Sequence, residues 1–424
     1  MADFLQLNIL DDGGIDITKD NFDFRNKPFA DSDVFESKVE GFQQLTTGND
    51  VKKIYELELS SKSFQFWPGD AIGILPCNDH IEVDKLFIRL GIEKNIRKRY
   101  KLSIKPDTVK KNPIIPKHIP PEGIFIDIFL NHVDVRKPMK KAFLKVLSKF
   151  TEDKEELGYL EHLTSPKGST KYLNFINGLG RTLLGLLNTF PKSFPPIETI
   201  LEHSQPLQPR FFSIASSPLS GTLKITFFIV ENPDGTKGVC TGWLENVLQN
   251  QEIIPVYFKT PGKFRIHEDP KRTIIMVATG TGLAPFKSFL DHRYFQKHSG
   301  RDIGKCILYY GCRYRDRDFL YKDILDKYLQ EGVLSNLYTA FSRDGDTKCY
   351  VQDKLKETGK EFVDSLFIDD AVVYICGDPK TMVKDVLSVI VSNIEQYHDC
   401  SERNAQDLLK CLQDDGRILI DSWT

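Results

Sequence analysis

The sequence predicts a multi-domain chain of the α+β and α/β classes: an antiparallel β domain with a helical insert, followed by a doubly wound parallel-sheet domain. Three observations support this prediction. Residues 35–75 and 210–259 contain segments that alternate apolar and polar residues, as half-buried antiparallel strands do. Residues 80–205, between them, carry apolar residues at helical spacing. From residue 273 onward, apolar strands alternate with helices, which indicates a parallel sheet covered on both faces.

The antiparallel domain is expected to begin after a polar leader. Residues 1–30 are polar and contain the breaker Asp-Asp-Gly-Gly, so we expect a tail or linker without a function of its own. The Trp-Pro-Gly-Asp sequence at 67–70 predicts a turn. Strands are expected over residues 39–45, 54–59, 71–75, 223–230 and 256–259.

Hydrophobic periodicity also predicts the helices and strands of the insert and of the last domain. In the insert, helices are expected over residues 81–90, 140–150, 155–163 and 173–190, and the proline- and lysine-rich residues 101–121 are expected to form a loop. In the last domain, strands are expected over residues 274–278, 306–311, 334–341 and 371–377. Helices are expected over residues 286–294, 320–329, 351–356 and 381–394.

Length and composition narrow the functional classes. The 424 residues suffice for two or three domains, and 57 basic against 59 acidic residues give no excess of positive charge for nucleic acid. No apolar run approaches the roughly 20 residues that span a bilayer, and the first residues lack a secretory signal. The eight cysteines form no CxxC pair, so we expect no metal site and no disulfide framework. Free thiols favour a cytoplasmic location.

A motif at the midpoint of the chain carries the first chemical signal. Residues 209–217 have the sequence Pro-Arg-Phe-Phe-Ser-Ile-Ala-Ser-Ser. Arg210 offers a planar fork of donors for a pyrophosphate, Phe212 a flat face for a fused ring, and Ser213 a hydroxyl near that ring. This combination suits a flavin dinucleotide. The alternative is a half-buried strand with one solvated arginine.

Two further stretches follow predicted strands of the last domain. Residues 278–285, Ala-Thr-Gly-Thr-Gly-Leu-Ala-Pro, join a strand to a helix, where glycines let backbone N–H groups approach a pyrophosphate. Residues 342–350 supply two cations and a hydroxyl that suit the 2′-phosphate of NADPH. The alternatives are a tight turn without a ligand for the first stretch and a solvated surface loop for the second.

Three shorter stretches remain ambiguous on their own. Residues 238–244 join a small-residue turn to a helix start and suit a second diphosphate, although a simple helix cap explains them equally well. Cys376 ends the last predicted strand, where a functional side chain would meet a ligand, but a buried cysteine is usually a small apolar residue. Trp423 is a packing residue, a frayed end or a stacking lid over an aromatic ring.

Seven stretches in this order, over residues 25–424, closely resemble the FAD- and NADPH-binding half of the diflavin reductases. They are RFFSIASS, GVCTGWL, ATGTGLAPF, YGCRYRDRDFLY, SRDGDTKCYVQ, YICGDPKTMVKDV and the final DSWT. The resemblance implies a ferredoxin-reductase-like FAD-binding antiparallel β-barrel with a helical insert, and then a doubly wound NADPH-binding domain. The implied limits are a tail at 1–30, the FAD domain at 31–79 and 206–267, the insert at 80–205 and the NADP domain at 268–424.

The resemblance also implies roles for individual residues. The FAD set is Arg210, Phe211, Phe212, Ser213, Thr226, Phe227, Phe228, Gly238, Val239, Cys240, Thr241 and Trp423, which covers the isoalloxazine ring. The NADPH set is Lys38, Thr281, Arg313, Ser342, Arg343, Lys348, Tyr350, Gln352 and Asp385. The implied catalytic set for hydride transfer is Ser213, Cys376 and Asp421, with Trp423 as a gate.

The chain departs from the family pattern in three respects. Phe212 replaces a tyrosine, which removes one hydroxyl contact to the flavin, and Asn232 replaces an aromatic residue that flanks the adenine. The family's FMN domain is missing from these residues, so an FMN-containing flavodoxin-like domain or protein is an expected partner. Stretches such as 117–120 and 137–144 favour the branch whose final acceptor is cobalamin-dependent methionine synthase. The alternatives are a reductase for cytosolic iron–sulfur assembly, one of the cytochrome P450 reductase type, or a scaffold protein that retains the fold.

Overall fold

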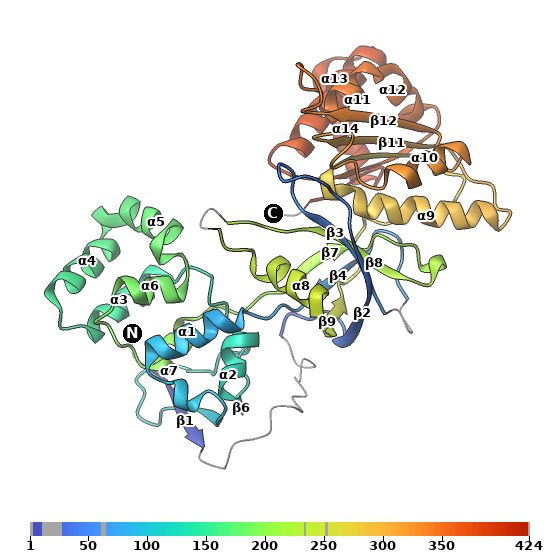
Figure 1. Ribbon diagram of the computed structural model, residues 1–424. Helices are drawn as coiled ribbons and strands as arrows, with labels where there is room; N and C mark the ends of the chain where they lie inside the picture. The colour runs from blue at the N-terminus through green and yellow to red at the C-terminus, as the bar shows by residue number, and fades with distance from the viewer. Residues whose placement is uncertain (1–2, 11–27, 61–64, 233–234, 251–252, 423–424) are drawn as a thin grey trace. The chain divides into compact units, whose positions relative to one another are not determined.

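The computed structural model describes residues 3–10, 28–60, 65–232, 235–250, 253–422 (Figure 1). Contacts divide the chain into two compact units. The first unit comprises residues 1–30, 74–210 and 238–244, and the second comprises residues 31–73, 211–237 and 245–424. Each unit is described by itself below.

The first unit contains a small antiparallel sheet that the sequence patterns did not predict. Strand β1 (Leu5–Leu10) pairs with β5 (Arg99–Ile104), which pairs with β6 (Glu122–Ile124). The expectation of a tail is therefore wrong for residues 5–10, and that of a loop is wrong for the start of residues 101–121. The backbone N–H groups of Phe4 and Leu5 donate to the Glu202 carboxylate at 2.6 and 2.7 Å, which fixes the start of β1. The Asp-Asp-Gly-Gly breaker at 11–14 lies outside the described residues.

Helices surround this sheet and share one apolar core with it. They are α1 (His80–Leu90), α2 (Phe125–Asp127), α3 (Lys141–Leu147), α4 (Lys154–Thr164), α5 (Ser169–Asn177), α6 (Leu183–Thr189) and α7 (Ile197–His203). Helix α1 begins where the Asp79 carboxylate accepts the Glu82 N–H and ends at Gly91 in the left-handed conformation. The single helix expected over residues 173–190 is two helices, because the chain breaks at Gly178 between α5 and α6.

A six-stranded antiparallel sheet forms the first part of the second unit. Its strands, in spatial order, are β7 (Arg210–Ser213), β4 (Ala71–Ile74), β9 (Ile253–Phe258), β2 (Phe35–Gln44), β3 (Ile54–Leu59) and β8 (Leu223–Phe228). The predicted antiparallel fold is confirmed. Within the described residues, however, the edge strands β7 and β8 do not pair along their length, so the sheet does not close into a continuous barrel. The two edges meet through one isolated bridge, between Ile214 and Ile225.

The second part of the second unit is a parallel sheet with the strand order β12-β11-β10-β13-β14. Its strands are β10 (Ile274–Thr279), β11 (Cys306–Cys312), β12 (Asn336–Phe341), β13 (Val372–Cys376) and β14 (Ile418–Asp421). The first four confirm the predicted strands to within two residues. The sequence patterns missed β14, whose four residues are too few to show a period.

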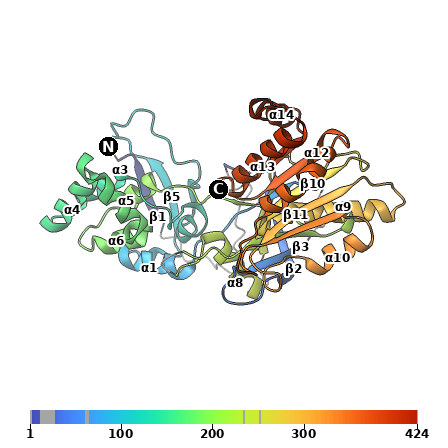
Figure 2. The ribbon, with the colours of Figure 1, turned by 90° about the horizontal axis from the view of Figure 1, so that it is seen from above.

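Helices cover both faces of the parallel sheet, as the doubly wound prediction requires. They are α9 (Ala284–His298), α10 (Lys322–Gln330), α11 (Val351–Glu357), α12 (Gly359–Phe367), α13 (Met382–Tyr397) and α14 (Glu402–Asp414). Met276 and Ala278 of β10 pack toward α9 and α10, whereas Ile275 and Val277 pack toward α11–α14. Figure 2 shows α9 and α10 on one side of this sheet and α12–α14 on the other.

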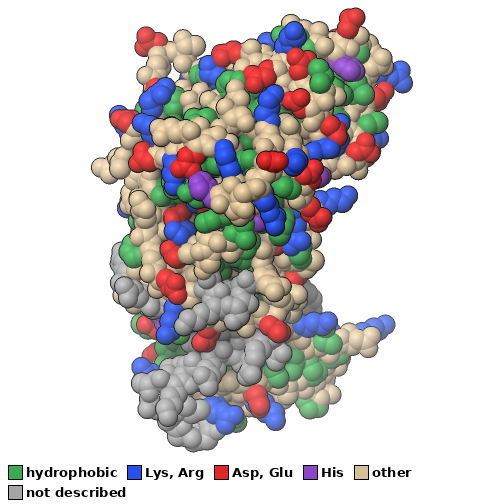
Figure 3. All heavy atoms as spheres, turned by 90° about the vertical axis from the view of Figure 1, so that its right-hand side faces the viewer, with side chains coloured by type: hydrophobic (Ala, Val, Ile, Leu, Met, Phe, Trp, Pro, Cys, Tyr) green, Lys and Arg blue, Asp and Glu red, His purple; other side chains and the backbone are tan. Residues whose placement is uncertain are grey.

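The described residues lack a membrane-spanning helix, a metal-binding cluster and a disulfide. No helix there is long and apolar enough to cross a membrane. No group of His, Cys, Asp and Glu side chains in the same residues is placed to hold a metal ion. All eight cysteines are free thiols. On the face shown in Figure 3, basic and acidic side chains are interspersed.

Candidate functional site

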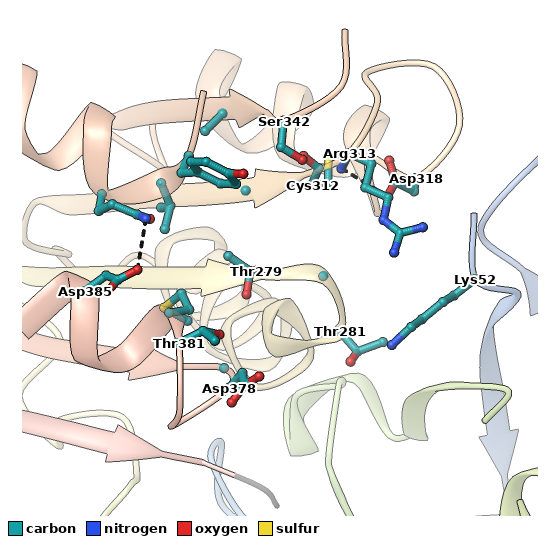
Figure 4. Close-up of a pocket in the computed structure, with 18 of the residues that line it drawn as sticks. Lys52, Thr279, Thr281, Cys312, Arg313, Asp318, Ser342, Asp378, Thr381 and Asp385 are labelled. Carbon is teal, nitrogen blue, oxygen red and sulfur yellow. Dashed lines mark hydrogen bonds between the residues drawn. The ribbon is translucent and has the colours of Figure 1, made fainter. Parts of the chain in front are cut away.

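A cavity of about 860 Å³ lies in the second unit, at the carboxyl ends of β10, β11, β12 and β13. Ligands of open α/β sheets bind at this edge. Six members of the predicted NADPH set line the cavity (Figure 4): Thr281, Arg313, Ser342, Tyr350, Gln352 and Asp385. Phe228, which the family resemblance assigned to FAD, also lines it. The structure therefore brings most of the predicted NADPH residues together.

The turn from β10 into α9 has the shape of a phosphate cradle. Gly280 adopts φ 54°, and a Cβ on Gly282 would lie 2.4 Å from the Cys376 carbonyl oxygen, so both positions need glycine. The Tyr310 hydroxyl donates to the Gly280 carbonyl at 3.3 Å. No side chain of the described residues caps the start of α9. The Ala284 N–H donates to the Thr281 carbonyl and Pro285 has no N–H, so the N–H groups left for a pyrophosphate are those at the start of the Gly280–Leu283 turn, which leads into this 15-residue helix.

The loops after β11 and β12 form the next part of the cavity and are tied to each other. The Ser342 N–H donates to the Cys312 carbonyl at 3.0 Å, and the Arg343 N–H donates to the Arg313 carbonyl at 2.9 Å. The Asp318 carboxylate accepts the Arg313 N–H at 3.1 Å. These contacts fix the backbone from which Arg313 and Ser342 face the cavity (Figure 4). At the far side, the Gln352 amide donates to Asp385 at 3.4 Å.

Three members of the predicted NADPH set lie outside the cavity lining. Arg343 and Lys348 are exposed on the loop after β12, and within the described residues neither side chain has an ion-pair partner. Lys38 is exposed on β2, where its backbone pairs with Ile253. The geometry gives Arg343 and Lys348 freedom to reach a phosphate at the cavity mouth, whereas it places Lys38 in a strand of the antiparallel sheet.

The predicted hydride-transfer residues converge on one carboxylate oxygen. Ser213 Oγ donates to Asp421 Oδ2 at 3.2 Å, and the Cys376 thiol donates to the same oxygen at 3.9 Å. The parallel register sets Cys376 directly beside Asp421. Burial raises the pKa of Asp421, although the hydrogen bond from Ser213 and the charge of Lys259 oppose the rise. Burial and the nearby Asp421 raise the pKa of the Cys376 thiol. Gly377, the residue after Cys376, lines the cavity.

The aromatic residues of the predicted FAD set differ in exposure. The ring of Phe212 packs edge-on against Phe227, with centroids 6.0 Å apart, and Phe227 is buried. The ring of Phe211 is 45% exposed, and Lys259 Nζ lies 4.9 Å from its centroid. The half-buried Phe212 and the exposed Phe211 fit an aromatic ligand, whereas Phe227 supports Phe212 and Tyr257 supports Phe211 from the interior.

Thr226 has an internal partner. Its hydroxyl lies 2.6 Å from the hydroxyl of Tyr321, which in turn donates to Glu56 at 2.7 Å. Thr226 is 5% exposed. Its side chain therefore links β8 to the start of α10 and β3. Only its backbone remains for a ligand.

The residues predicted to bind the FAD diphosphate, Arg210 and residues 238–241, lie in the first unit. Arg210 Nη1 donates to the Gln208 carbonyl at 2.5 Å, which leaves its other N–H groups for a ligand. Burial raises the pKa of the Cys240 thiol to about 12, and the charge of Arg210 acts against that rise. Arg210 is therefore close to residues 238–241, where α8 (Val239–Asn250) begins. A cation beside a helix N-terminus fits a diphosphate. Trp423 lies outside the described residues.

The structure adds cavity residues that the sequence interpretation did not single out. Thr279, Asp378 and Thr381 line the cavity from stretches that the resemblance already contained (Figure 4). Thr279 and Asp378 directly follow predicted strands and Thr381 begins a predicted helix, and these positions could have identified them. Lys52 also lines the cavity, but it belongs to the loop between β2 and β3 and to no motif. No local signal in the sequence marks it.

Comparison with known protein families defines the class. A model described as "FAD binding domain" matches residues 27–243, just over half of the chain, and one described as "Oxidoreductase NAD-binding domain" matches residues 276–388. The chain belongs to the FAD binding domain family. Together the two matches confirm the predicted class, a flavoprotein oxidoreductase with FAD and a nicotinamide dinucleotide as its cofactors.

Individual relatives are more specific. Methionine synthase reductase of Rattus norvegicus is 35% identical over 92% of this chain and 61% of its own length, and that of Bos taurus is 36% identical over the same shares. NADPH–cytochrome P450 reductase of Salmo trutta is 28% identical over 95% of this chain and 65% of its own length. The predicted resemblance to the FAD/NADPH half of the diflavin reductases is confirmed. The chain spans about three fifths of the length of the curated relatives it matches.

Proposed function

We propose that this chain is the NADPH-oxidising half of a flavoprotein reductase that passes electrons singly to cobalamin-dependent methionine synthase. NADPH would supply a hydride to FAD, and the two electrons would leave FAD one at a time, with the proton released to solvent. One observation carries the proposal most directly: Ser213, Cys376 and Asp421 meet at one oxygen beside the dinucleotide cavity. The identity to methionine synthase reductases, higher than that to the cytochrome P450 reductase, supports the choice of acceptor.

Bound NADPH and FAD supply the redox chemistry itself, as donor and acceptor of a hydride and, for FAD, as a donor of single electrons. The chain positions the two rings and shapes the charge around them. The Asp421 carboxylate holds Ser213 Oγ and the Cys376 thiol in fixed orientations through its two accepted hydrogen bonds. A carboxylate at that point stabilises positive charge that develops on a nicotinamide during hydride loss.

The remaining site residues bind the two dinucleotides in this proposal. The turn at Gly280–Leu283, which leads into α9, takes the NADPH pyrophosphate, and Ser342, Arg343 and Lys348 take its 2′-phosphate. Arg210 and residues 238–241 take the FAD diphosphate, and Phe212 lies against its ring. In the same proposal Trp423 covers the opposite face of that ring.

Electron delivery requires a further component in this proposal. In a diflavin reductase an FMN-containing flavodoxin-like domain receives single electrons from the FAD half, so such a domain or protein is the proposed partner. Methionine synthase is the proposed final acceptor. The eight free thiols support the cytoplasm as the proposed location, because disulfides are rare there.

The direct test is the absorption spectrum of the chain before and after addition of NADPH without oxygen. We expect flavin bands that bleach on addition of NADPH. A colourless protein after supply of FAD, or bands that NADPH leaves unchanged, would contradict the proposal.

The choice of acceptor needs a separate assay. The chain is combined with a flavodoxin-like FMN protein and then with cobalamin-loaded methionine synthase, an iron–sulfur acceptor or a cytochrome P450. Reactivation of methionine synthase at the highest rate is the expected result. Faster reduction of either other acceptor would replace methionine synthase in the proposal while leaving the NADPH–FAD reaction intact.

A further inference from the structure

The hydroxyl of Tyr321 joins two strands of the antiparallel sheet to a helix that covers the parallel sheet. Tyr321 lies directly before α10. Its hydroxyl donates to Glu56 Oε2 of β3 at 2.7 Å and lies 2.6 Å from Thr226 Oγ1 of β8. A phenol has one proton, so the Thr226 hydroxyl donates to the phenol oxygen in turn. Glu56 and Thr226 are directly paired across the two strands, so this one group holds both strands.

The backbone at Tyr321 is held in an unusual conformation. Tyr321 adopts φ 56°, in the left-handed region that a bulky residue rarely occupies. The residue is buried, and its carbonyl accepts the Leu325 N–H at 2.9 Å, which begins α10. Burial and the Glu56 carboxylate raise the pKa of the hydroxyl, so the group remains a hydrogen-bond donor. A strained residue persists where the surrounding contacts determine it, and the polar contacts of this side chain lie on the antiparallel sheet.

The last residues of β8 contribute to both proposed cofactor sites. Thr226 contacts Tyr321, and Phe228 lines the dinucleotide cavity. Successive residues of a strand point to opposite faces, so Phe227 lies on the other face. There it packs against the ring of Phe212, which the proposed function places against the flavin. The Tyr321 hydroxyl therefore fixes β8 at the point where the strand supports one cofactor site and lines the other.

We propose that Tyr321 is a positioning residue for hydride transfer, which holds the flavin at a fixed place relative to the nicotinamide through Thr226 and Glu56. This inference rests on the proposed function, which it extends to a residue outside the cavity lining. Because Tyr321 does not line the cavity, it acts on the geometry of the reaction and not on the affinity for NADPH. A misplacement of about 1 Å between reacting groups can cost on the order of 100-fold in rate.

Tyr321→Phe removes only the hydroxyl and tests this role. Flavin reduction, followed by stopped-flow absorbance at saturating NADPH, should slow ~10- to 100-fold. The NADPH concentration that gives half of the maximal rate should change by no more than about twofold. Tyr328→Phe is the matched control, because the Tyr328 hydroxyl of α10 donates to Asp291 of α9 at 2.5 Å, and both helices cover the parallel sheet. Its rate should be that of the unsubstituted chain.

Thr226 allows the same hydrogen bond to be tested from the other strand. Thr226→Val keeps the branched shape and loses the hydroxyl, whereas Thr226→Ser keeps the hydroxyl. Thr226→Val should slow flavin reduction roughly 3- to 30-fold, and Thr226→Ser should keep the rate. The combination of Thr226→Val with Tyr321→Phe should be no slower than Tyr321→Phe alone, because both substitutions remove the same hydrogen bond. Multiplied effects in the combined variant would overturn the link between the two residues.

Hydrogen–deuterium exchange on the FAD-loaded chain without NADPH gives a readout that does not depend on turnover. Tyr321→Phe should speed the exchange of residues 223–228 roughly tenfold, whereas Tyr328→Phe should leave it unchanged. Flavin reduction within about threefold of the unsubstituted rate for Tyr321→Phe, or equal slowing by Tyr328→Phe, would overturn the inference and leave the proposed function intact. An unsubstituted chain whose flavin NADPH does not reduce would overturn the proposed function and this inference together.

Discussion

The two ends of the proposed dinucleotide site are built differently. At the proposed nicotinamide end, beside the cavity, Ser213, Cys376 and Asp421 have their hydrogen bonds already formed, and the register of β13 and β14 fixes the spacing of Cys376 and Asp421. At the proposed adenosine end, Arg343 and Lys348 are exposed and have no ion-pair partners within the described residues. Residues at the ends of paired strands are positioned by the sheet, whereas residues on a loop are positioned by what they bind. In the proposed function, the first end is preorganised for hydride transfer, whereas the loop residues of the second end select the nucleotide on binding it.

The largest effect is expected at the preorganised end. Asp421→Asn removes the negative charge and should slow flavin reduction by NADPH ~100- to 1,000-fold, as loss of a preorganised electrostatic group does in other enzymes. Stopped-flow absorbance at saturating NADPH measures the rate. Asp414→Asn, at an exposed position of α14, should leave it unchanged. A rate within threefold of the unsubstituted chain for Asp421→Asn would remove the carboxylate from the mechanism.

Gly282→Ala tests the rigid turn between the two ends. The new Cβ would lie 2.4 Å from the Cys376 carbonyl oxygen, so backbone must move, and we expect a loss of about 1–3 kcal/mol in the free energy of unfolding. Gly345→Ala, on the exposed loop, has nothing closer than 4.0 Å and is the control. Urea unfolding of both variants measures the difference. Equal stabilities would show that the turn is no more rigid than the loop.

Because Arg343 and Lys348 are proposed to bind the 2′-phosphate, their substitution should weaken the binding of NADPH and not that of NADH. Arg343→Ala and Lys348→Ala should each raise KM for NADPH roughly tenfold and leave KM for NADH unchanged, because only NADPH carries the 2′-phosphate. Steady-state kinetics with both cofactors provides the measurement. An equal rise in KM for NADH would show that these residues do not recognise the 2′-phosphate. The proposed difference between the two ends would then be wrong.

The smallest effect concerns stability against pH. Burial raises the pKa of Asp421 above 3.8, so the folded chain binds more protons than the unfolded chain between pH 3.8 and the raised value. The contribution of Asp421 to the free energy of unfolding should therefore decrease as pH rises through that window. Urea unfolding from pH 4 to 7 should show a flatter profile for Asp421→Asn, whereas Arg343→Ala should keep the original slope. Parallel profiles for all three proteins would contradict the raised pKa.

The sequence predicted the parallel domain better than the other parts, for a physical reason. Strands β10 and β13 are buried on both faces, so they appear as continuous apolar runs that need no knowledge of their neighbours. Strand β1 could not be recognised, because six residues gain their stability from pairing with β5, about 90 positions away. The break at Gly178 was missed because apolar residues continue at helical spacing on both sides of it.

The candidate site divides in the same way. Four predicted residues lie just after strands of the parallel sheet or near the start of its covering helices: Thr281, Arg313, Ser342 and Asp385. The motifs and the sheet topology together therefore predicted that they converge. Lys52 reaches the cavity only because the loop after β2 is held against the residues after β11, a contact between segments about 260 positions apart. The same applies to Thr226: its sequence context suggests a ligand, and the distant Tyr321 takes its hydroxyl instead. Long-range contacts of this kind leave no local pattern.

The first strand has a practical consequence for any shortened version of this protein. Removal of residues 1–10 as an apparent leader would leave β5 at an open edge of its sheet, with backbone groups free to pair with another molecule. It would also remove Phe4 and Leu5 from the core of the first unit and leave the Glu202 carboxylate without the two N–H groups it now accepts. If such a shortened protein aggregated, the cause would be the loss of β1 and not instability of the flavin-binding domain.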